Sequence, residues 1–199
     1  MSNGLKSYVI MGMGVVFMVM LGAFWMGYNS LVSKEENVME SWSQVESNLQ
    51  RKLDLLPNLV KVVKTYAKHE KELLTEITAL RSNADKLLNE NESLPNEAQI
   101  SKLGKMKQHL DTSLLKLFAV AENYPDLKSS EQFLQLQSQI EGAENRINIT
   151  RMQFNSSVGG FNSYMRTIPA NIIASIGGFQ RKAYFKAEDQ AHKKIDLGL

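Results

Sequence analysis

The residues best suited to chemistry in this sequence are two carboxylates, Glu141 and Glu144, in a segment with the pattern of a helix. Side chains three positions apart share one face of a helix. Paired carboxylates can perform acid–base catalysis or hold a di-metal centre. A di-metal helix requires Glu-x-x-His, however, and Asn145 and Arg146 follow Glu144 here. We therefore expect Glu144 to pair with a lysine or an arginine.

Other catalytic and metal-binding motifs are missing from the sequence. It contains no GxxxxGK phosphate loop, no HExxH zinc helix and no nucleophile elbow. Its three histidines, His69, His109 and His192, lie far apart, and no pair has the spacing of metal ligands. Because there is no cysteine, disulfides, thiolate nucleophiles and cysteine-based metal sites are excluded. We expect no catalytic residue, metal, cofactor or small-molecule substrate, and a protein that is not an enzyme.

Composition and charge narrow the class of protein further. The 199 residues allow one domain, or one domain with an anchor. Apolar residues make up 43% of the chain and charged residues 22%, which is enough for a packed core. The net charge of +2 is too small to indicate nucleic acid as a partner.

The N-terminal region has the composition of a membrane anchor. No residue between Lys6 and Lys34 is charged, and residues 8–28 are almost entirely apolar. A helix crosses a bilayer with about 20 apolar residues, and aromatic residues mark its two interfaces. A cleaved signal peptide would have a shorter apolar run followed by a small-residue cleavage site, and neither is found here. The predicted anchor residues are Tyr8, Phe17, Trp25 and Tyr28.

Two features of this anchor leave alternatives open. Ala23 and Gly27 form a small-xxx-small pair that could seat a second helix, although small residues are common in membrane spans in any case. Lys6 and the free amine flank one end, and Lys34, followed by two glutamates, flanks the other. The positive-inside rule weakly favours a cytoplasmic N-terminus. We expect a single pass through the bilayer and leave open the side on which the remaining chain lies.

Beyond the anchor, residues 28–56 contain no proline and are typical of an amphipathic helix. From Val38 to Leu56 the apolar residues recur at steps of three and four. If the membrane helix continues into this one, the stretch spans roughly 40 Å. Pro57 then falls inside the apolar pattern, where it marks either a kink or a tight corner.

The stretch from Leu59 to Leu87 has the clearest helical pattern in the chain. Its seam positions alternate steps of four and three, as in a coiled coil, and predict one uninterrupted helix. Glu70, beside His69, is the one charged seam position. Its carboxylate either fixes the register of the helices or reaches solvent at the rim.

Two further helices follow a polar loop at residues 89–99. The third has an apolar face from Leu103 to Ala121, and the fourth has one from Phe133 to Phe161. These patterns complete a predicted all-α fold, in which an up-and-down antiparallel bundle of about four long helices follows the anchor.

The loop between the third and fourth helices combines an aromatic residue with turn-forming residues. Pro125 follows Tyr124 and ends the third helix. Ser129 and Gln132 form a capping-box pattern that predicts the start of the fourth helix. Every residue of the loop thus has a structural use, and we expect it to turn the chain rather than to carry chemistry.

The last segment, residues 168–199, is first apolar and then basic. Three arrangements suit this composition: a segment lying on an anionic bilayer, a segment bound in a groove of a neighbouring subunit, or a tail folded back onto its own bundle. The apolar residues are Ile168, Ile172, Ile173, Ile176 and Phe179. The charged residues include Arg181, Lys182, Lys186, Lys193 and Lys194, against Glu188 and Asp189.

Several short motifs, in their order and spacing, resemble the bacterial LemA family over nearly the whole chain. They are Tyr28 to Val32, Trp42 to Val45, Leu49 to Lys52, Asp54 to Val60, Tyr66 to Glu70, Glu122 to Lys128, Phe133 to Gln137, Ile140 to Ile147, Phe154-Asn155, and Pro169 to Phe185. The resemblance implies a bundle of four antiparallel helices, preceded by a short segment and one membrane helix, in a bacterial inner membrane. It implies no enzymatic activity and no catalytic residue. The tail is more basic than the family pattern.

The family is often described with its N-terminus outside the cell, which conflicts with the weak charge bias above. The side of the membrane therefore stays open. We divide the chain into a short tail at 1–7, a transmembrane helix at 8–28, a LemA-like bundle at 29–167 and an apolar–basic tail at 168–199.

Two functions suit this organisation. The first is a membrane-anchored scaffold that self-associates into a homo-oligomer, because a long helix with few neighbours exposes more apolar surface than one small bundle covers. The candidate contact residues are Trp42, Tyr66, Ile172, Ile173 and Phe179. The second is an adaptor or sensor that docks onto another membrane protein, such as a quality-control protease, through the loop that contains Tyr124.

Overall fold

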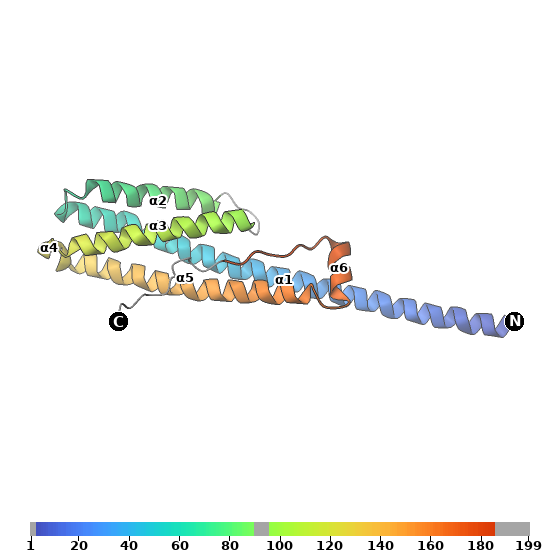
Figure 1. Cartoon of the computed structure of the whole chain (residues 1–199). Helices are drawn as coiled ribbons and strands as arrows, with labels where there is room; N and C mark the ends of the chain where they lie inside the picture. Colours follow the sequence, from blue (N-terminus) through green and yellow to red (C-terminus); the bar gives the residue numbers. More distant parts are fainter. Residues whose placement is uncertain (1–2, 90–95, 186–199) are drawn as a thin grey trace, which may run out of the picture. The chain divides into compact units, whose positions relative to one another are not determined.

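The computed structural model describes residues 3–89 and 96–185. Within these ranges the chain forms six helices and no strand, which confirms the predicted all-α class (Figure 1). The helices are α1 (Asn3–Tyr66), α2 (Lys71–Asn89), α3 (Glu97–Ala121), α4 (Pro125–Lys128), α5 (Glu131–Tyr164) and α6 (Ala170–Gly177).

The chain divides into two compact units. We call them the anchor unit, Met1–Val38 with Ser157–Lys182, and the bundle unit, Met39–Ser156 with Ala183–Leu199. Both α1 and α5 contribute residues to each unit.

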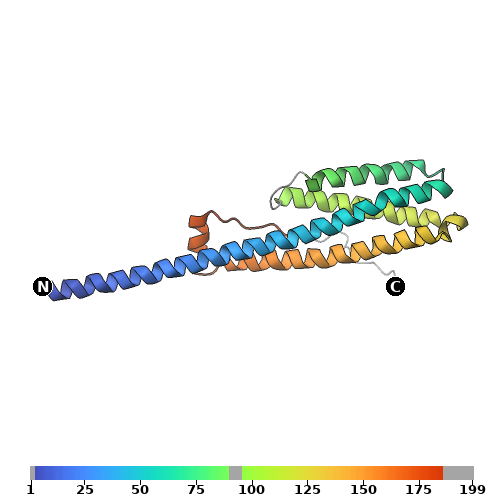
Figure 2. The same ribbon diagram turned by 180° about the vertical axis from the view of Figure 1, so that it is seen from behind.

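The bundle unit is an antiparallel arrangement of four long helices. It contains the later part of α1, all of α2 and α3, and the earlier part of α5, and each long helix runs opposite to the one before it (Figure 1; Figure 2). The apolar faces meet in one core, in which Leu56, Ile77 and Leu117 come from three different helices and are almost fully buried. The predicted up-and-down bundle is therefore confirmed.

Helix α1 continues through Pro57, which excludes a tight corner at this position. Proline has no backbone N–H, so the carbonyl four residues earlier loses its helical partner. That carbonyl belongs to Leu53, and it accepts a hydrogen bond of 3.3 Å from Nε of Arg81 on α2. A side chain of the neighbouring helix thus satisfies the group that the proline leaves without a backbone donor.

The prediction of one uninterrupted helix from Leu59 to Leu87 is wrong, because the chain turns between α1 and α2. Ala67 is buried at the turn, and its N–H still donates to the Val63 carbonyl at 2.8 Å. Glu70 is the last residue before α2, and its carbonyl accepts the N–H of Leu74 at 3.1 Å. No glycine or proline marks this turn, and the apolar spacing continues across it. The turn is instead stabilised by tertiary contacts that local sequence does not reveal.

The loop between α3 and α5 forms the short helix α4, which begins at Pro125. Leu127 is fully buried there, and the Tyr124 hydroxyl donates to the Glu70 carboxylate at 3.1 Å. The loop therefore packs against the turn between α1 and α2. The Glu70 carboxylate therefore has a partner, 54 positions away in the chain, as a carboxylate at a seam position requires unless it stays in water.

The predicted capping box at Ser129 is wrong by one residue. Ser129 ends α4, and its hydroxyl donates to the Asp126 carbonyl at 3.3 Å. Helix α5 begins at Glu131, so Ser130 is the residue that precedes it. Because Ser129 caps the single turn of α4, α5 begins one residue later than predicted.

In the anchor unit, α6 lies across α1 (Figure 1; Figure 2). Ile173 of α6 is buried, and a Cβ added at Gly27 of α1 would collide with its side chain. Gly27, from the predicted small-residue pair, thus does seat a second helix. Gly178 ends α6 with a φ of +72°, a left-handed conformation that favours glycine. The N–H of Phe179 then donates to the Ala174 carbonyl at 3.0 Å.

Of the three arrangements predicted for the tail, folding back onto its own chain is found for the described part. The basic and acidic residues after Phe185 lie outside the described residues. They are Lys186, Glu188, Asp189, Lys193, Lys194 and Asp196.

Candidate functional site

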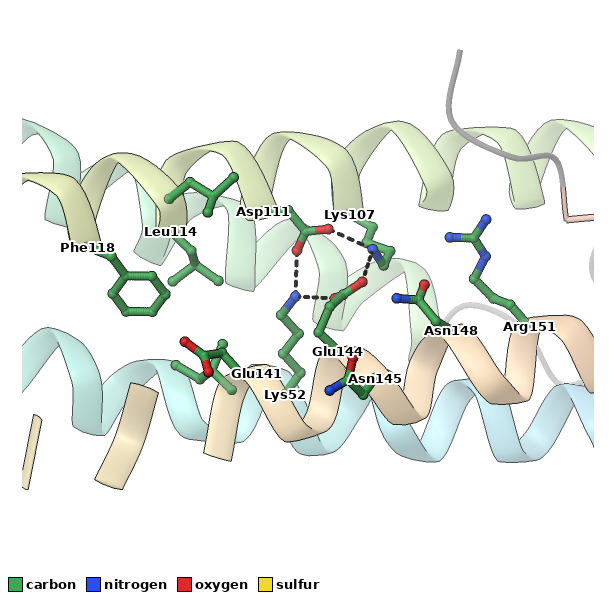
Figure 3. A pocket seen from close by; sticks show the side chains of 12 residues that line it. Lys52, Lys107, Asp111, Leu114, Phe118, Glu141, Glu144, Asn145, Asn148 and Arg151 are labelled. Atoms are coloured by element: carbon green, nitrogen blue, oxygen red, sulfur yellow. Dashed lines mark hydrogen bonds and ion pairs between the residues drawn. The ribbon is translucent and has the colours of Figure 1, made fainter. Parts of the chain in front are cut away.

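One site of the bundle unit is a closed ring of four ion pairs, which we call the charge ring. It consists of Lys52 on α1, Lys107 and Asp111 on α3, and Glu144 on α5 (Figure 3). Lys52 Nζ lies 2.5 Å from Asp111 Oδ1 and 2.6 Å from Glu144 Oε2. Lys107 Nζ lies 2.6 Å from Asp111 Oδ2 and 2.7 Å from Glu144 Oε1. The expected pairing of Glu144 with a basic residue is confirmed.

The charge ring is balanced, and its two lysines are the buried members. The side chains of Lys52 and Lys107 are each 3% exposed, whereas those of Asp111 and Glu144 are 24% and 28% exposed. A buried ammonium group is costly unless it is paired and hydrogen-bonded. Here each ammonium donates to both carboxylates. Because the ring contains two ammonium groups and two carboxylates, it carries no net charge.

The ring favours the charged forms of Glu144 and Lys107. Burial by itself would raise the pKa of Glu144, but Lys52 and Lys107 outweigh it and hold that pKa below the usual range. Burial by itself would lower the pKa of Lys107, but Asp111 and Glu144 outweigh it and raise that pKa above its ordinary value. Both groups therefore stay ionised at neutral pH. General acid–base catalysis needs the opposite, a group poised to exchange a proton.

A cavity of about 610 Å³ lies between α3 and α5 beside the charge ring. Glu141 lines it but is not a member of the ring (Figure 3). Its carboxylate accepts a hydrogen bond of 3.0 Å from Gln137 Nε2. The two carboxylates singled out in the sequence therefore have different partners. Across residues 3–89 and 96–185, no three His, Cys, Asp or Glu residues come together as metal ligands. The other walls are formed by Leu114, Leu115, Phe118, Ile140, Asn145, Asn148 and Arg151.

Sequence reasoning missed three of the four members of the charge ring. Lys107 and Asp111 are four residues apart, and this helical ion-pair spacing was a usable signal. Lys52 gave no such signal, because its partners are 59 and 92 residues away in the chain.

The bundle unit also contains an aromatic cluster around Trp42. The indole packs edge-on against Phe154, with ring centroids 5.2 Å apart, and lies 6.4 Å from the ring of Phe185. The guanidinium of Arg151 lies over the Phe185 ring at 4.7 Å. Asn155 accepts the N–H of Phe185 at 2.8 Å and donates to its carbonyl at 2.9 Å. Trp42 is thus buried by residues of its own chain.

In the anchor unit, the segment after α6 is attached to α1 and α5. The ring of Phe179 packs edge-on against Tyr28 at 5.5 Å and lies 6.4 Å from Phe161. The Asn162 side chain donates to the Lys182 carbonyl and accepts its N–H, both at 2.9 Å. The ammonium of Lys182 pairs with Glu35 and lies over the Phe161 ring.

The residues predicted to mediate contacts differ in exposure. Trp42 and Ile173 are buried within the chain, and Phe179 is half-buried. Tyr124 is half-buried and bonded to Glu70, whereas Tyr66 and Ile172 are exposed. The predicted anchor residues Tyr8, Phe17, Trp25 and Tyr28 are all exposed on α1.

The fold and this exposed apolar stretch define a membrane-associated helical-bundle protein. In the part of the chain that the structure describes, α1 is the one helix long and apolar enough to cross a membrane. The chain matches the LemA family over residues 41–197, and it belongs to that family. The family resemblance noted in the sequence is therefore confirmed.

Relatives in several bacteria extend over most of the chain. The magnetosome protein MamQ of Magnetospirillum gryphiswaldense is 27% identical over 176 residues, which cover 80% of this chain and 65% of that protein. Magnetosome protein MamQ 2 of Paramagnetospirillum magneticum is 27% identical over 177 residues, with 81% and 65% covered. Protein LemA of Metamycoplasma hominis is 25% identical over 184 residues, with 90% and 80% covered. The chain thus spans 65% of the length of the magnetosome relatives.

Proposed function

We propose that this protein is a non-enzymatic scaffold that a single membrane-spanning helix anchors in a bacterial inner membrane, and that it self-associates there into a homo-oligomer. The observation that carries the proposal is the continuity of α1. The exposed apolar stretch and the first long helix of the bundle are parts of the same helix, from Asn3 to Tyr66. A bundle joined in this way to a membrane span stays beside the membrane.

The chemistry of the bundle supports a structural function. In the charge ring the lysines and the carboxylates form ion pairs with one another. The raised pKa of Lys107 and the lowered pKa of Glu144 favour the charged form of each group. The names of the relatives designate a magnetosome protein and a LemA protein, and none of them designates a reaction.

Exposed apolar side chains on the bundle unit support self-association. Ile149 and Met152 lie one turn apart on α5, and they are 56% and 73% exposed. Residues three positions apart share a helix face, so these two side chains form a small apolar surface, which we call the α5 patch. Exposed apolar patches commonly mark protein–protein contacts, and most homo-oligomers repeat one such contact by symmetry.

The adaptor function ranks second. It requires the loop around Tyr124 to receive a partner, yet the hydroxyl of Tyr124 is bonded to Glu70 and Leu127 is fully buried. These contacts give the loop an architectural role within its own unit. Loss of a co-purifying protein in Tyr124→Ala would favour the adaptor function over the scaffold.

The proposal is tested by the particle mass of the full-length protein in mild detergent, measured by light scattering. We expect a discrete particle several times heavier than one chain. Ile149→Asp with Met152→Asp should shift it toward a single chain without loss of helix content. Thr75→Asp and Thr112→Asp are the controls, since each adds a charge at an exposed position on another helix. A single-chain mass for the unaltered protein would contradict the proposal.

A further inference from the structure

Helix α6 has three distinct faces, although it contains only eight residues. Ala170, Ile173 and Ala174 form the face that is buried in the anchor unit. Asn171 and Ser175 form a polar, exposed flank. The remaining flank is apolar and exposed, and it consists of Ile172 and Ile176.

The apolar flank is unusually exposed for isoleucine. Ile172 and Ile176 are 58% and 68% exposed. They are four residues apart within the helix, so they form one row along α6. The row is separated from Asn171 and Ser175 by roughly 100° around the helix axis. A helix with one apolar flank and one polar flank is suited to a boundary between an apolar phase and water.

The place where α6 meets α1 indicates which boundary this is. Ile173 packs against Gly27, and the backbone at Gly177 approaches the ring of Tyr28. These α1 residues end the apolar stretch 8–28, close to the exposed Trp25. Aromatic residues at the end of a membrane span lie at the level of the lipid headgroups. The contact therefore places α6 at that same level along α1.

An ion pair of the anchor unit lies farther along α1. Lys182 pairs with Glu35, which is eight residues beyond Gly27. At 1.5 Å per residue, that ion pair is about 12 Å from the α6 contact along the helix. The order along α1 is thus apolar side chains, then the aromatic residues with α6, and then the ion pair.

We infer that α6 is an interfacial helix, which lies in the plane of the membrane surface and places the Ile172–Ile176 row into the boundary between headgroups and acyl chains. The inference rests on the membrane-anchoring part of the proposed function and adds a second lipid contact to it. Gly27 is the reason that α6 stays at this depth, because the absence of a side chain lets Ile173 pack directly against α1.

Single cysteines test the inference in the full-length protein, since the natural chain contains none. Ile172→Cys and Ile176→Cys report on the apolar flank, and Asn171→Cys and Ser175→Cys are the matched controls on the polar flank. Val15→Cys, on the exposed apolar part of α1, reports on the anchor. Each variant carries a nitroxide label in vesicles of phosphatidylethanolamine and phosphatidylglycerol, and its collisions with oxygen and with a water-soluble nickel complex are measured.

We expect the ratio of oxygen to nickel collisions to be several-fold higher at 172 and 176 than at 171 and 175. Nickel collisions that dominate at all four positions, with oxygen dominating at 15, would overturn the inference and leave the anchor intact. Exclusion of both reagents at 172 and 176 would also overturn it, because a protein surface would then cover the flank. Nickel collisions that dominate at 15 would show that the anchoring itself fails, and the inference with it.

Discussion

The bundle unit and the anchor unit differ in how far their apolar side chains are buried and in how their charged side chains are paired. In the bundle unit most large apolar residues are buried among four helices, and two lysines are buried in a neutral ring of ion pairs. In the anchor unit, apolar side chains of α1 and α6 are widely exposed, and Lys182 pairs with a single carboxylate, Glu35. The first unit supplies its own apolar interior. The second exposes its apolar side chains, and in the proposed function a bilayer covers those of α1.

The largest effect on stability is expected from the charge ring. Glu144→Ala leaves Lys52 and Lys107 with one carboxylate between them, and loss of one partner from a buried ion pair costs about 3 kcal/mol. Urea unfolding of the full-length protein in mild detergent, followed by circular dichroism, measures the change. The control is Lys128→Ala, which removes an exposed pair with Glu122 and should cost less than about 0.5 kcal/mol. Equal effects of the two variants would show that the ring has no special contribution.

The pH dependence of the same unfolding sharpens this prediction. Since the pKa of Glu144 is lowered by folding, its contribution is present above the ordinary value of 4.5 and is lost as the pH falls through the folded pKa. Since the pKa of Lys107 is raised, its contribution is present below 10.5 and is lost as the pH rises beyond the folded pKa. Stability should therefore decline on both sides of this window. In Glu144→Gln the acid-side decline should be smaller, and an unchanged decline would contradict the assignment.

A smaller effect is expected where α1 passes Pro57. Arg81→Met keeps much of the length of the side chain but removes the donor to the Leu53 carbonyl, and an unsatisfied backbone group costs about 1–2 kcal/mol. The same urea titration measures it. In a Pro57→Ala background the carbonyl regains a backbone donor, so the effect of Arg81→Met should shrink. An effect of the same size in both backgrounds would mean that Arg81 contributes through other contacts.

The smallest effect on bundle stability is expected from Gly27→Leu, although this change should alter the anchor unit. The new side chain would occupy the space of Ile173 and release α6 from α1, so a label at 172 should gain nickel collisions. Gly22→Leu is the matched control, because a Cβ at Gly22 meets open space. If both variants leave the label at 172 unchanged, contact with Gly27 does not determine the depth of α6.

The sequence predicted the elements that depend on local periodicity. The apolar faces of α3 and α5 recur every three or four residues, and both helices were found where that spacing placed them. The turn at Ala67 could not be predicted in this way, because neither glycine nor proline interrupts the spacing there. The contact from Tyr124 to Glu70 at this turn joins residues that are 54 positions apart.

The candidate site was predictable only in part, for the same reason. Glu144 was expected to meet a basic residue, but Lys52 and Lys107 come from other helices and could be named only once the helices were packed. Likewise, Gly27 indicated a seat for a second helix, whereas the occupant, Ile173 of α6, lies almost 150 residues later in the chain.

The central claim, self-association of an anchored bundle, is tested most directly by cysteine crosslinking in intact bacterial membranes. Single cysteines at Ile149 and Met152 report on the α5 patch, and Thr75→Cys and Thr112→Cys report on exposed positions of α2 and α3. We predict covalent dimers on mild oxidation for the two patch positions and few or none for the controls. The absence of dimers at 149 and 152, with the protein present in the membrane, would contradict the account.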